Sequence, residues 1–158
     1  MKAYTVNPIG TIHFDADGPI LQMEESYAPA LRELEGFSHI NVLWWCHECD
    51  SEEARSILEV PSPYRKAPEI MGIFATRSPM RPNPVALTAA QVIHIDHETG
   101  AIRLAYIDAE DGTPVLDIKP YTPSIDRVEK PEVPIWCGHW PKSAETSGDF
   151  DWAGEFNF

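Results

Sequence analysis

Short β-type runs separated by turn residues dominate this sequence, and this alternation limits the folds that it can adopt. The runs 37–48, 70–76, 86–96 and 101–108 are rich in aromatic, β-branched or other apolar residues. HETG, at 97–100, joins the last two runs as a hairpin would, and AEDGTP, at 109–114, is a second turn. Helical patterns do not alternate with these runs, as they would in βαβ folds. The sequence therefore predicts an all-β, barrel-like domain with a mixed sheet.

A few local patterns refine this prediction. The run 37–48 is apolar at successive positions, which predicts a strand buried on both faces near its middle. YAPALRELEG, at 27–36, predicts a short helix capped by Ser26 and ended by Gly36. A capping box of Asp50 and Glu53 predicts one or two further helical turns. We expect a barrel domain over residues 1–127 and an extended C-terminal arm, 128–158, that lies against the same domain.

Composition excludes several classes of protein. Of 158 residues, 43% are hydrophobic, which is sufficient for a core, but no apolar run approaches the roughly 20 residues of a membrane span. The first ten residues lack the hydrophobic segment of a signal peptide. Three cysteines are too few, and odd in number, for a disulfide framework. We expect a cytoplasmic protein that does not contact a membrane.

Charge weighs against an autonomous, tight nucleic-acid binder. The formal net charge is −13, whereas binding to phosphates depends on neutralising cations. The segment 60–87 differs, because it carries Arg65, Lys66, Arg77 and Arg81 against Glu69 alone. One positive patch on an otherwise negative molecule is therefore expected.

That segment contains the most unusual loop in the chain, RSPMRPNP at 77–84. Its three prolines fix the backbone and hold Arg77, Arg81 and Asn83 in a preset arrangement. Preorganised guanidinium groups suit carboxylate or phosphate recognition. A stiff structural turn with solvated arginines is the alternative interpretation.

Two other segments carry polar chemistry. DAEDGTPVLD, at 108–117, places four acids around an Asp111-Gly112 turn whose backbone groups could face a ligand, although it could equally be an acidic surface turn. CHEC, at 46–49, has the C-x-x-C spacing of zinc and redox sites. If the strand continues through it, the two thiols point to opposite faces. We therefore expect no metal site, and His47 and Glu48 become candidates for the rim of a pocket.

FSHINVLWWCHE, MGIFATRSPMRPNPVALT and DGTPVLDIKPY occur in this order, and together they resemble the TrmO-type, or TsaA-like, family of S-adenosylmethionine-dependent tRNA methyltransferases. The resemblance covers about residues 9–127. It implies an all-β barrel that forms a homodimer, with S-adenosyl-L-methionine bound near the dimer interface. The implied reaction is N6-methylation of a threonylcarbamoyl-modified adenosine beside the tRNA anticodon.

The resemblance also implies roles for individual residues. Carried over by position, the cofactor contacts are His47, Glu48, Arg77, Leu87, Asp111, Gly112, Thr113 and Pro114. The chemistry itself requires that the acceptor nitrogen lose a proton, and Asp117, His47 and Glu48 are candidates for the general base that takes it. Arg81 and Asn83 are assigned instead to the structure of the loop or to binding of a substrate phosphate.

This chain departs from the family pattern in ways that concern the substrate more than the cofactor. Ala86 stands where the family usually has glycine, and the acidic segment DADGPILQMEES replaces the family's basic N-terminal segment. Two other functions therefore stay open. One is a methyltransferase for a small molecule or another RNA, and the other is a non-catalytic module that binds S-adenosyl-L-methionine.

Overall fold

Six antiparallel strands close into a barrel in the computed structural model, which describes residues 2–158. Their order around the barrel is β1-β2-β7-β6-β3-β8. The strands are β1 (Gly10–Asp15), β2 (Gly18–Met23), β3 (His39–Trp45), β6 (Val85–Asp96), β7 (Ala101–Leu104) and β8 (Thr113–Pro120). The expected all-β barrel is confirmed. The sheet is not mixed, because each of these six strands runs antiparallel to both neighbours.

The barrel interior is apolar, and β3 shows why. Ile40, Val42 and Trp44 alternate along the strand and are buried, whereas the residues between them are only partly buried. This is the period-two pattern of a strand with one face in the core, so the expected burial of both faces was too strong. The Trp44 indole N–H donates to Thr88 Oγ1 on the adjacent β6 at 3.1 Å, which satisfies the polar atom of this large core side chain.

Hairpin turns set the register at the barrel ends. The expected hairpin at HETG is confirmed between β6 and β7, and Asp96 closes it by accepting from the Thr99 hydroxyl at 2.7 Å. The hairpin between β1 and β2 was missed, because the acidic DADG segment resembles a loop. There Arg103 of β7 binds Asp15 through two nitrogens at 2.6 and 2.8 Å.

Helical structure in the described residues is limited to short segments. The expected helix at 27–36 is instead the 3-10 helix η1 (Glu25–Leu31), and Ser26 lies inside it rather than capping it. Pro29 within the segment and a positive φ of 65° at Glu33 prevent a regular α-helix from continuing. In α1 (Glu52–Arg55), Ser51 is the N-cap and accepts from the Ala54 amide at 3.0 Å.

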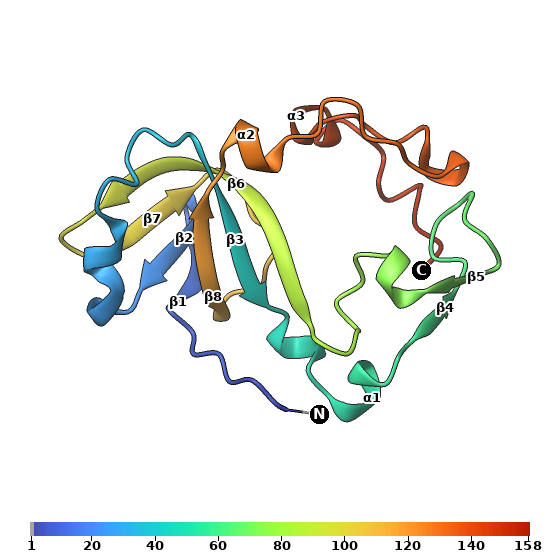
Figure 1. Ribbon diagram of the computed structural model, residues 1–158, viewed down its shortest axis with the longest axis horizontal. Coiled ribbons are helices and arrows are strands. Elements are labelled where there is room, and N and C mark those ends of the chain that lie inside the picture. Colours follow the sequence, from blue (N-terminus) through green and yellow to red (C-terminus); the bar gives the residue numbers. More distant parts are fainter. Residues whose placement is uncertain (1) are drawn as a thin grey trace.

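A long excursion, residues 46–84, leaves the barrel between β3 and β6. It contains η2 (His47–Cys49), α1, the two-stranded sheet of β4 (Glu59–Pro61) and β5 (Ile70–Gly72), and η3 (Ile73–Ala75). The expected strand over 70–76 is therefore shorter and ends in a 3-10 turn. The excursion lies to one side of the barrel (Figure 1).

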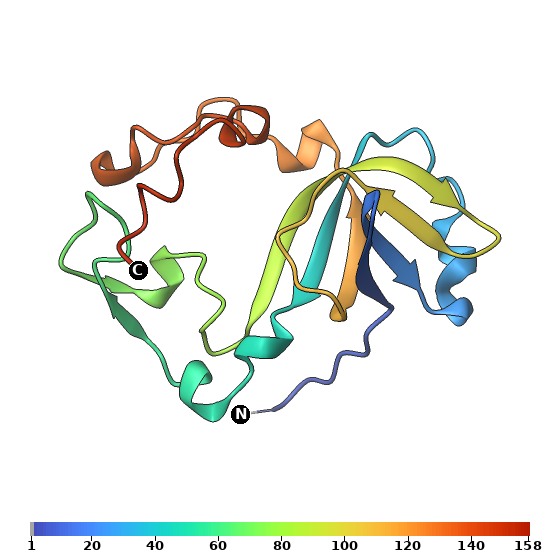
Figure 2. The same cartoon turned by 180° about the vertical axis from the view of Figure 1, so that it is seen from behind.

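The C-terminal arm, residues 128–158, follows α2 (Pro123–Asp126) and contains η4 (Ile135–Cys137) and α3 (Ala144–Ser147). It extends from the barrel towards the excursion, and the C-terminus lies beside β4 and β5 in both views (Figures 1 and 2). Within residues 2–158, none of the helices has the length and apolar character needed to cross a bilayer.

Candidate functional site at one end of the barrel

Three strand ends meet where the motif residues lie. β3 ends at Trp45, which pairs with Val85 at the start of β6. One residue earlier, Trp44 pairs with Val115, near the start of β8. The segments that follow β3 and that precede β6 and β8 therefore leave the barrel at the same end, although they are far apart in sequence.

His47 and Thr113 form the most direct link between two of these segments. Thr113 begins β8 and is 1% exposed, and its Oγ1 lies 3.4 Å from His47 Nδ1. His47 follows the last residues of β3, and the exposed Glu48 is next to it in η2. The structure thus joins the first and third sequence motifs through a side-chain contact.

The acidic turn before β8 is tied to β1. Asp111 Oδ1 accepts from the Phe14 amide at 3.0 Å, and the Gly112 amide donates to the Ile12 carbonyl at 2.8 Å. Gly112 has a φ of 80°, a conformation that glycine adopts without strain. His13 Nδ1 lies 3.5 Å from Asp111 Oδ1. Sequence reasoning missed His13, because only the register of β1 against β8 brings it to this turn.

The two arginines of the proline-rich loop have different surroundings. Arg77 Nη2 donates to the Leu87 carbonyl in β6 at 2.7 Å. Arg81 Nη2 instead lies 3.4 Å from the Ile73 carbonyl, and its guanidinium carbon is 5.9 Å from the centre of the Phe74 ring. Arg77 is therefore attached to the barrel, whereas Arg81 braces the loop against η3.

Pro84 and Asn83 complete the connection between the loop and the barrel. The Cys46 amide donates to the Pro84 carbonyl at 2.7 Å, which joins the start of the excursion to its end. Asn83 is exposed, and its carbonyl accepts from the Val85 amide at 2.7 Å. Because Pro84 is also buried, the loop ends at a fixed point.

Leu87 and Asp117 lie on the outer face of the barrel, on either side of Leu43. Leu43 of β3 pairs with Leu87 of β6 on one side and with Asp117 of β8 on the other. Both Asp117 oxygens have partners, since Lys119 Nζ lies 2.6 Å from Oδ2 and the Ile118 amide donates to Oδ1 at 3.0 Å.

Leu87, Leu43 and Asp117 form a row across three strands. This row lies close to the rim of the barrel, by which we mean the end where β3 stops and β6 and β8 begin. Leu87 is two residues from Val85, which corresponds to roughly 7 Å of strand. Arg77, Leu87 and Asp117 thus lie just below the rim on the outer face, and His47 and the turn at 111–114 lie at the rim itself. The structure brings the candidates to one end of the barrel in two adjoining groups.

The C-x-x-C segment differs from its expected conformation. The strand ends at Trp45, and Cys49 lies in η2, so the two thiols do not lie in one continuous strand and the expectation that they point to opposite strand faces does not apply. Burial, together with the nearby Cys49 and Asp108, raises the pKa of Cys46 to about 11, against the opposing effect of Arg81. Its surroundings thus favour the neutral thiol over the thiolate. Residues 2–158 contain no group of three acidic, histidine or cysteine side chains arranged to hold a metal.

The chain resembles a known protein family and several known proteins. A family model described as the tRNA-methyltransferase O N-terminal domain matches residues 6–127. An S-adenosyl-L-methionine-binding protein of Archaeoglobus fulgidus is 35% identical over 108 residues, which cover 68% of this chain and 72% of that protein. A probable S-adenosyl-L-methionine-binding protein of Methanothermobacter thermautotrophicus is 41% identical over 115 residues, or 72% of this chain and 76% of that protein.

Solved structures extend the likeness to three dimensions. A crystal structure of TrmO from Pseudomonas aeruginosa has a TM-score of 0.66 and 28% identity to this chain. The alignment covers 85% of this chain but 62% of the other. This chain thus spans less than two thirds of the solved protein's length.

Proposed function

The chain belongs to the family of the tRNA-methyltransferase O N-terminal domain, and from this premise we propose that it is an S-adenosyl-L-methionine-dependent methyltransferase. The observation that carries the proposal is that the proline-rich loop and the acidic turn lie at the same end of the barrel, next to β6 and β8 on either side of β3. The contact between His47 and Thr113 links the acidic turn to the end of β3, and the bond from Arg77 to Leu87 fixes the loop beside it.

The residues at this end suit the chemical groups of the cofactor. Arg77 uses Nη2 to bind Leu87, and its remaining N–H groups can bind the cofactor's carboxylate. The half-exposed Leu87 offers an apolar surface for the adenine. Asp111 carries negative charge for the sulfonium or accepts from a ribose hydroxyl. We assign His47, Glu48, Gly112, Thr113 and Pro114 to the wall around these groups.

S-adenosyl-L-methionine, when bound, supplies a methyl group on a positively charged sulfur. The residues of this chain must hold the acceptor in line, exclude water and take a proton from it. In the net reaction, a nitrogen–carbon bond forms, the carbon–sulfur bond breaks, and the proton of the acceptor nitrogen passes to the base. Of the three candidate bases we favour His47, because Thr113 orients its Nδ1 side and Nε2 can then face the acceptor. Asp117 already has partners at both oxygens.

We propose as the methyl acceptor N6 of threonylcarbamoyl-adenosine in tRNA. The excursion supports this choice, because it presents the exposed cations Arg65 and Lys66 in addition to Arg81 and Asn83 of the loop. These side chains can bind phosphates on a molecule whose net charge of −13 repels RNA elsewhere.

We further propose that the protein is a homodimer. The excursion exposes several large apolar side chains, and unpartnered apolar surface of this kind is typical of protein–protein contacts. They are Leu58, Ile70, Phe74 and Met80. A second copy covering them would also enclose Arg77, Leu87 and Asp117 on the outer face of the barrel. In a single chain this part of the site is open to solvent.

A module that binds S-adenosyl-L-methionine without turning it over is the second candidate. The names of the archaeal relatives favour it, since both describe binding and not catalysis. Incubating the protein with the cofactor and tRNA that carries threonylcarbamoyl-adenosine separates the two functions. We expect S-adenosylhomocysteine and methylated nucleoside in equal amounts by mass spectrometry. Binding of the cofactor without either product would favour the module.

A further inference from the structure

The C-terminal arm lies outside the residues that match the family model, which end at 127, yet it is bonded to the excursion. Its last residues add to the excursion like a short strand, since Tyr64 and Phe156 form an antiparallel bridge. The Arg65 amide donates to the Glu155 carbonyl at 2.8 Å. The Asn157 side chain donates to the Ser62 carbonyl at 2.9 Å and to the Tyr64 carbonyl at 3.0 Å.

An aromatic cluster covers this junction. Tyr64 is 8% exposed, and its ring stacks on Trp136 with centroids 5.5 Å apart. Trp140 meets the same ring edge-on at 4.9 Å, and Trp152 continues the cluster against Trp140. These three tryptophans all belong to the arm. Tyr64 is therefore the residue of the excursion through which the aromatic cluster attaches it to the arm.

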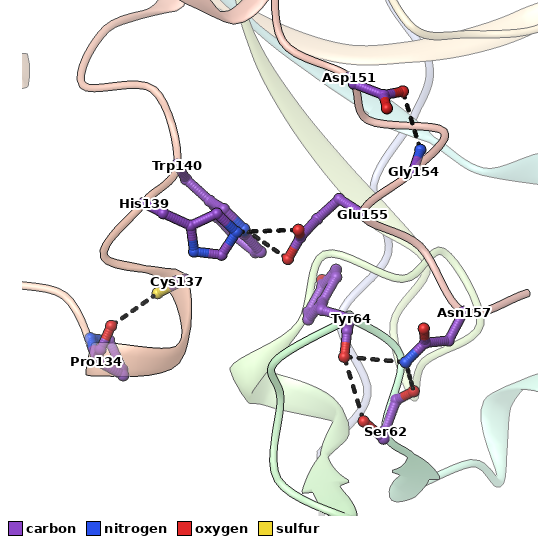
Figure 3. A network of polar contacts seen from close by, with 10 residues as sticks. All are labelled: Ser62, Tyr64, Pro134, Cys137, His139, Trp140, Asp151, Gly154, Glu155 and Asn157. Atoms are coloured by element: carbon purple, nitrogen blue, oxygen red, sulfur yellow. Dashed lines mark hydrogen bonds and ion pairs between the residues drawn. The ribbon is translucent and has the colours of Figure 1, made fainter.

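Glu155 closes the arm on itself beside this cluster. Its side chain is 4% exposed and accepts from His139 Nε2 at 3.0 Å and from Trp140 Nε1 at 2.9 Å. Both donors point at the carboxylate (Figure 3). Burial raises the pKa of Glu155, but the bonds from His139 and Trp140 outweigh it, and the pKa lies below its usual value. A buried carboxylate with both oxygens bonded fixes its neighbours, whereas an unpaired one would be costly.

Backbone hydrogen bonds connect the part of the excursion that the arm contacts, around Ser62 and Tyr64, to the proline-rich loop. The Ser62 amide donates to the Glu69 carbonyl at 2.8 Å, and the Ile73 amide donates to the Leu58 carbonyl at 2.8 Å, so β4 holds β5 at both ends. The Ile73 carbonyl then accepts from the Thr76 hydroxyl at 2.8 Å and from Arg81. The loop therefore rests on the same small sheet that the arm holds.

We propose that Glu155 is a positioning residue: it keeps the C-terminal arm closed on the excursion and so fixes the proline-rich loop, 77–84, against the barrel. The effect on cofactor affinity rests on the function proposed above, but the effect on the loop does not. None of the contacts between the arm and the excursion involves a residue of the barrel strands. The barrel therefore keeps its structure when these contacts are lost.

Hydrogen–deuterium exchange on the full chain, comparing Glu155→Ala with the wild type, tests the effect on the loop. We expect peptides covering 62–82 to exchange about tenfold faster in the variant, since charged hydrogen bonds are lost, while peptides of β3 and β6 keep their rates. Glu155→Gln retains acceptor capacity and should fall in between. Asp149→Ala, an exposed acid of the same arm, is the matched control and should match the wild type. Unchanged exchange of 62–82 in Glu155→Ala would overturn the proposal.

Calorimetric titration with S-adenosyl-L-methionine then tests the consequence for the site. We expect the Kd to rise about fivefold to tenfold in Glu155→Ala and to stay at the wild-type value in Asp149→Ala. Faster exchange with an unchanged Kd would overturn the positioning role. If the wild type gives no binding, the proposed function fails, and the exchange experiment still decides whether the arm holds the loop. Should Glu155→Ala not fold, Asn157→Ala breaks the junction at the other end, and the same two outcomes apply.

Discussion

Arg77 and Leu87 are joined by a hydrogen bond of 2.7 Å between the guanidinium Nη2 and the carbonyl oxygen. The bond connects the first residue of the proline-rich loop to Leu87, which lies two residues after Val85, the start of β6. It explains why a cationic, rigid loop stands between two apolar segments: the prolines limit the loop's freedom, and the arginine sets its distance from β6.

Arg77 should therefore affect cofactor binding through charge and geometry together. We expect Arg77→Gln to weaken S-adenosyl-L-methionine binding about tenfold, as the loss of a charged hydrogen bond does. Arg77→Lys should recover only part of this, because an ammonium group lacks the planar fork of N–H donors. Calorimetry gives the three Kd values. Arg32→Gln, at an exposed arginine beside η1, is the control, and an equal loss in that variant would count against a local role for Arg77.

Gly112 should be sensitive to a single added methyl group for backbone reasons alone. Its φ is 80°, and an added Cβ would meet no atom within 4 Å, so any loss reflects conformational strain. We expect Gly112→Ala to lower the free energy of unfolding by about 1–2 kcal/mol. Urea unfolding measures this.

Gly148 provides the matched control for that experiment. A Cβ added at Gly148 would also meet no atom within 4 Å, but the φ of this residue is −65°, which alanine adopts freely. Gly148→Ala should keep or slightly raise stability. Equal losses at the two glycines would contradict the assignment of strain to Gly112.

The Asp15–Arg103 pair predicts a pH dependence of stability. The hydrogen bond from Arg103, helped by the Asp17 amide, lowers the pKa of Asp15 from 3.8 to about 2. The folded state thus favours the charged carboxylate, and its contribution is complete above the unfolded pKa and is lost as the pH falls from about 4 towards 2. The stability difference between wild type and Asp15→Asn, from urea unfolding, should shrink between pH 5 and pH 2.5. Asp149→Asn should show no such trend, and a constant difference for Asp15→Asn would refute the assignment.

Phe74 should contribute to the proposed dimer. It is 78% exposed in the single chain and lies under the Arg81 guanidinium. Replacing it with serine removes apolar contact area from the interface without disturbing the core. We expect sedimentation at micromolar concentration to give a dimer for the wild type and a larger monomer fraction for Phe74→Ser. Val133→Ser, at an exposed apolar residue of the arm, is the control and should remain dimeric. A monomeric wild type would contradict the dimer proposal.

Sequence alone predicted the barrel because its strongest strands carry their own signals. The β6–β7 hairpin followed from the HETG turn, and β3 from its apolar residues. β2 was missed, because the acidic residues around Gly18 are typical of a loop. Its alternating residues form a strand through pairing with β1. The η1 segment was misread because Pro29 and the left-handed Glu33 act against a helical pattern that looked regular.

The candidate site residues came from motifs and a family resemblance, but their grouping did not. No sequence pattern placed Asp117 and Leu87 on either side of Leu43, because that row depends on the pairing of three strands distant in sequence. The partnership of Glu155 with His139 was also beyond prediction, since it arises where an irregular arm turns back on itself.

The most direct test of the central claim is calorimetric titration of the folded chain with S-adenosyl-L-methionine. We predict saturable binding with one cofactor per protomer, weakened in Arg77→Gln and retained in Arg32→Gln. No binding heat at millimolar cofactor, measured at two temperatures with a protein whose circular dichroism shows a folded β-structure, would contradict the claim that this end of the barrel is a cofactor site.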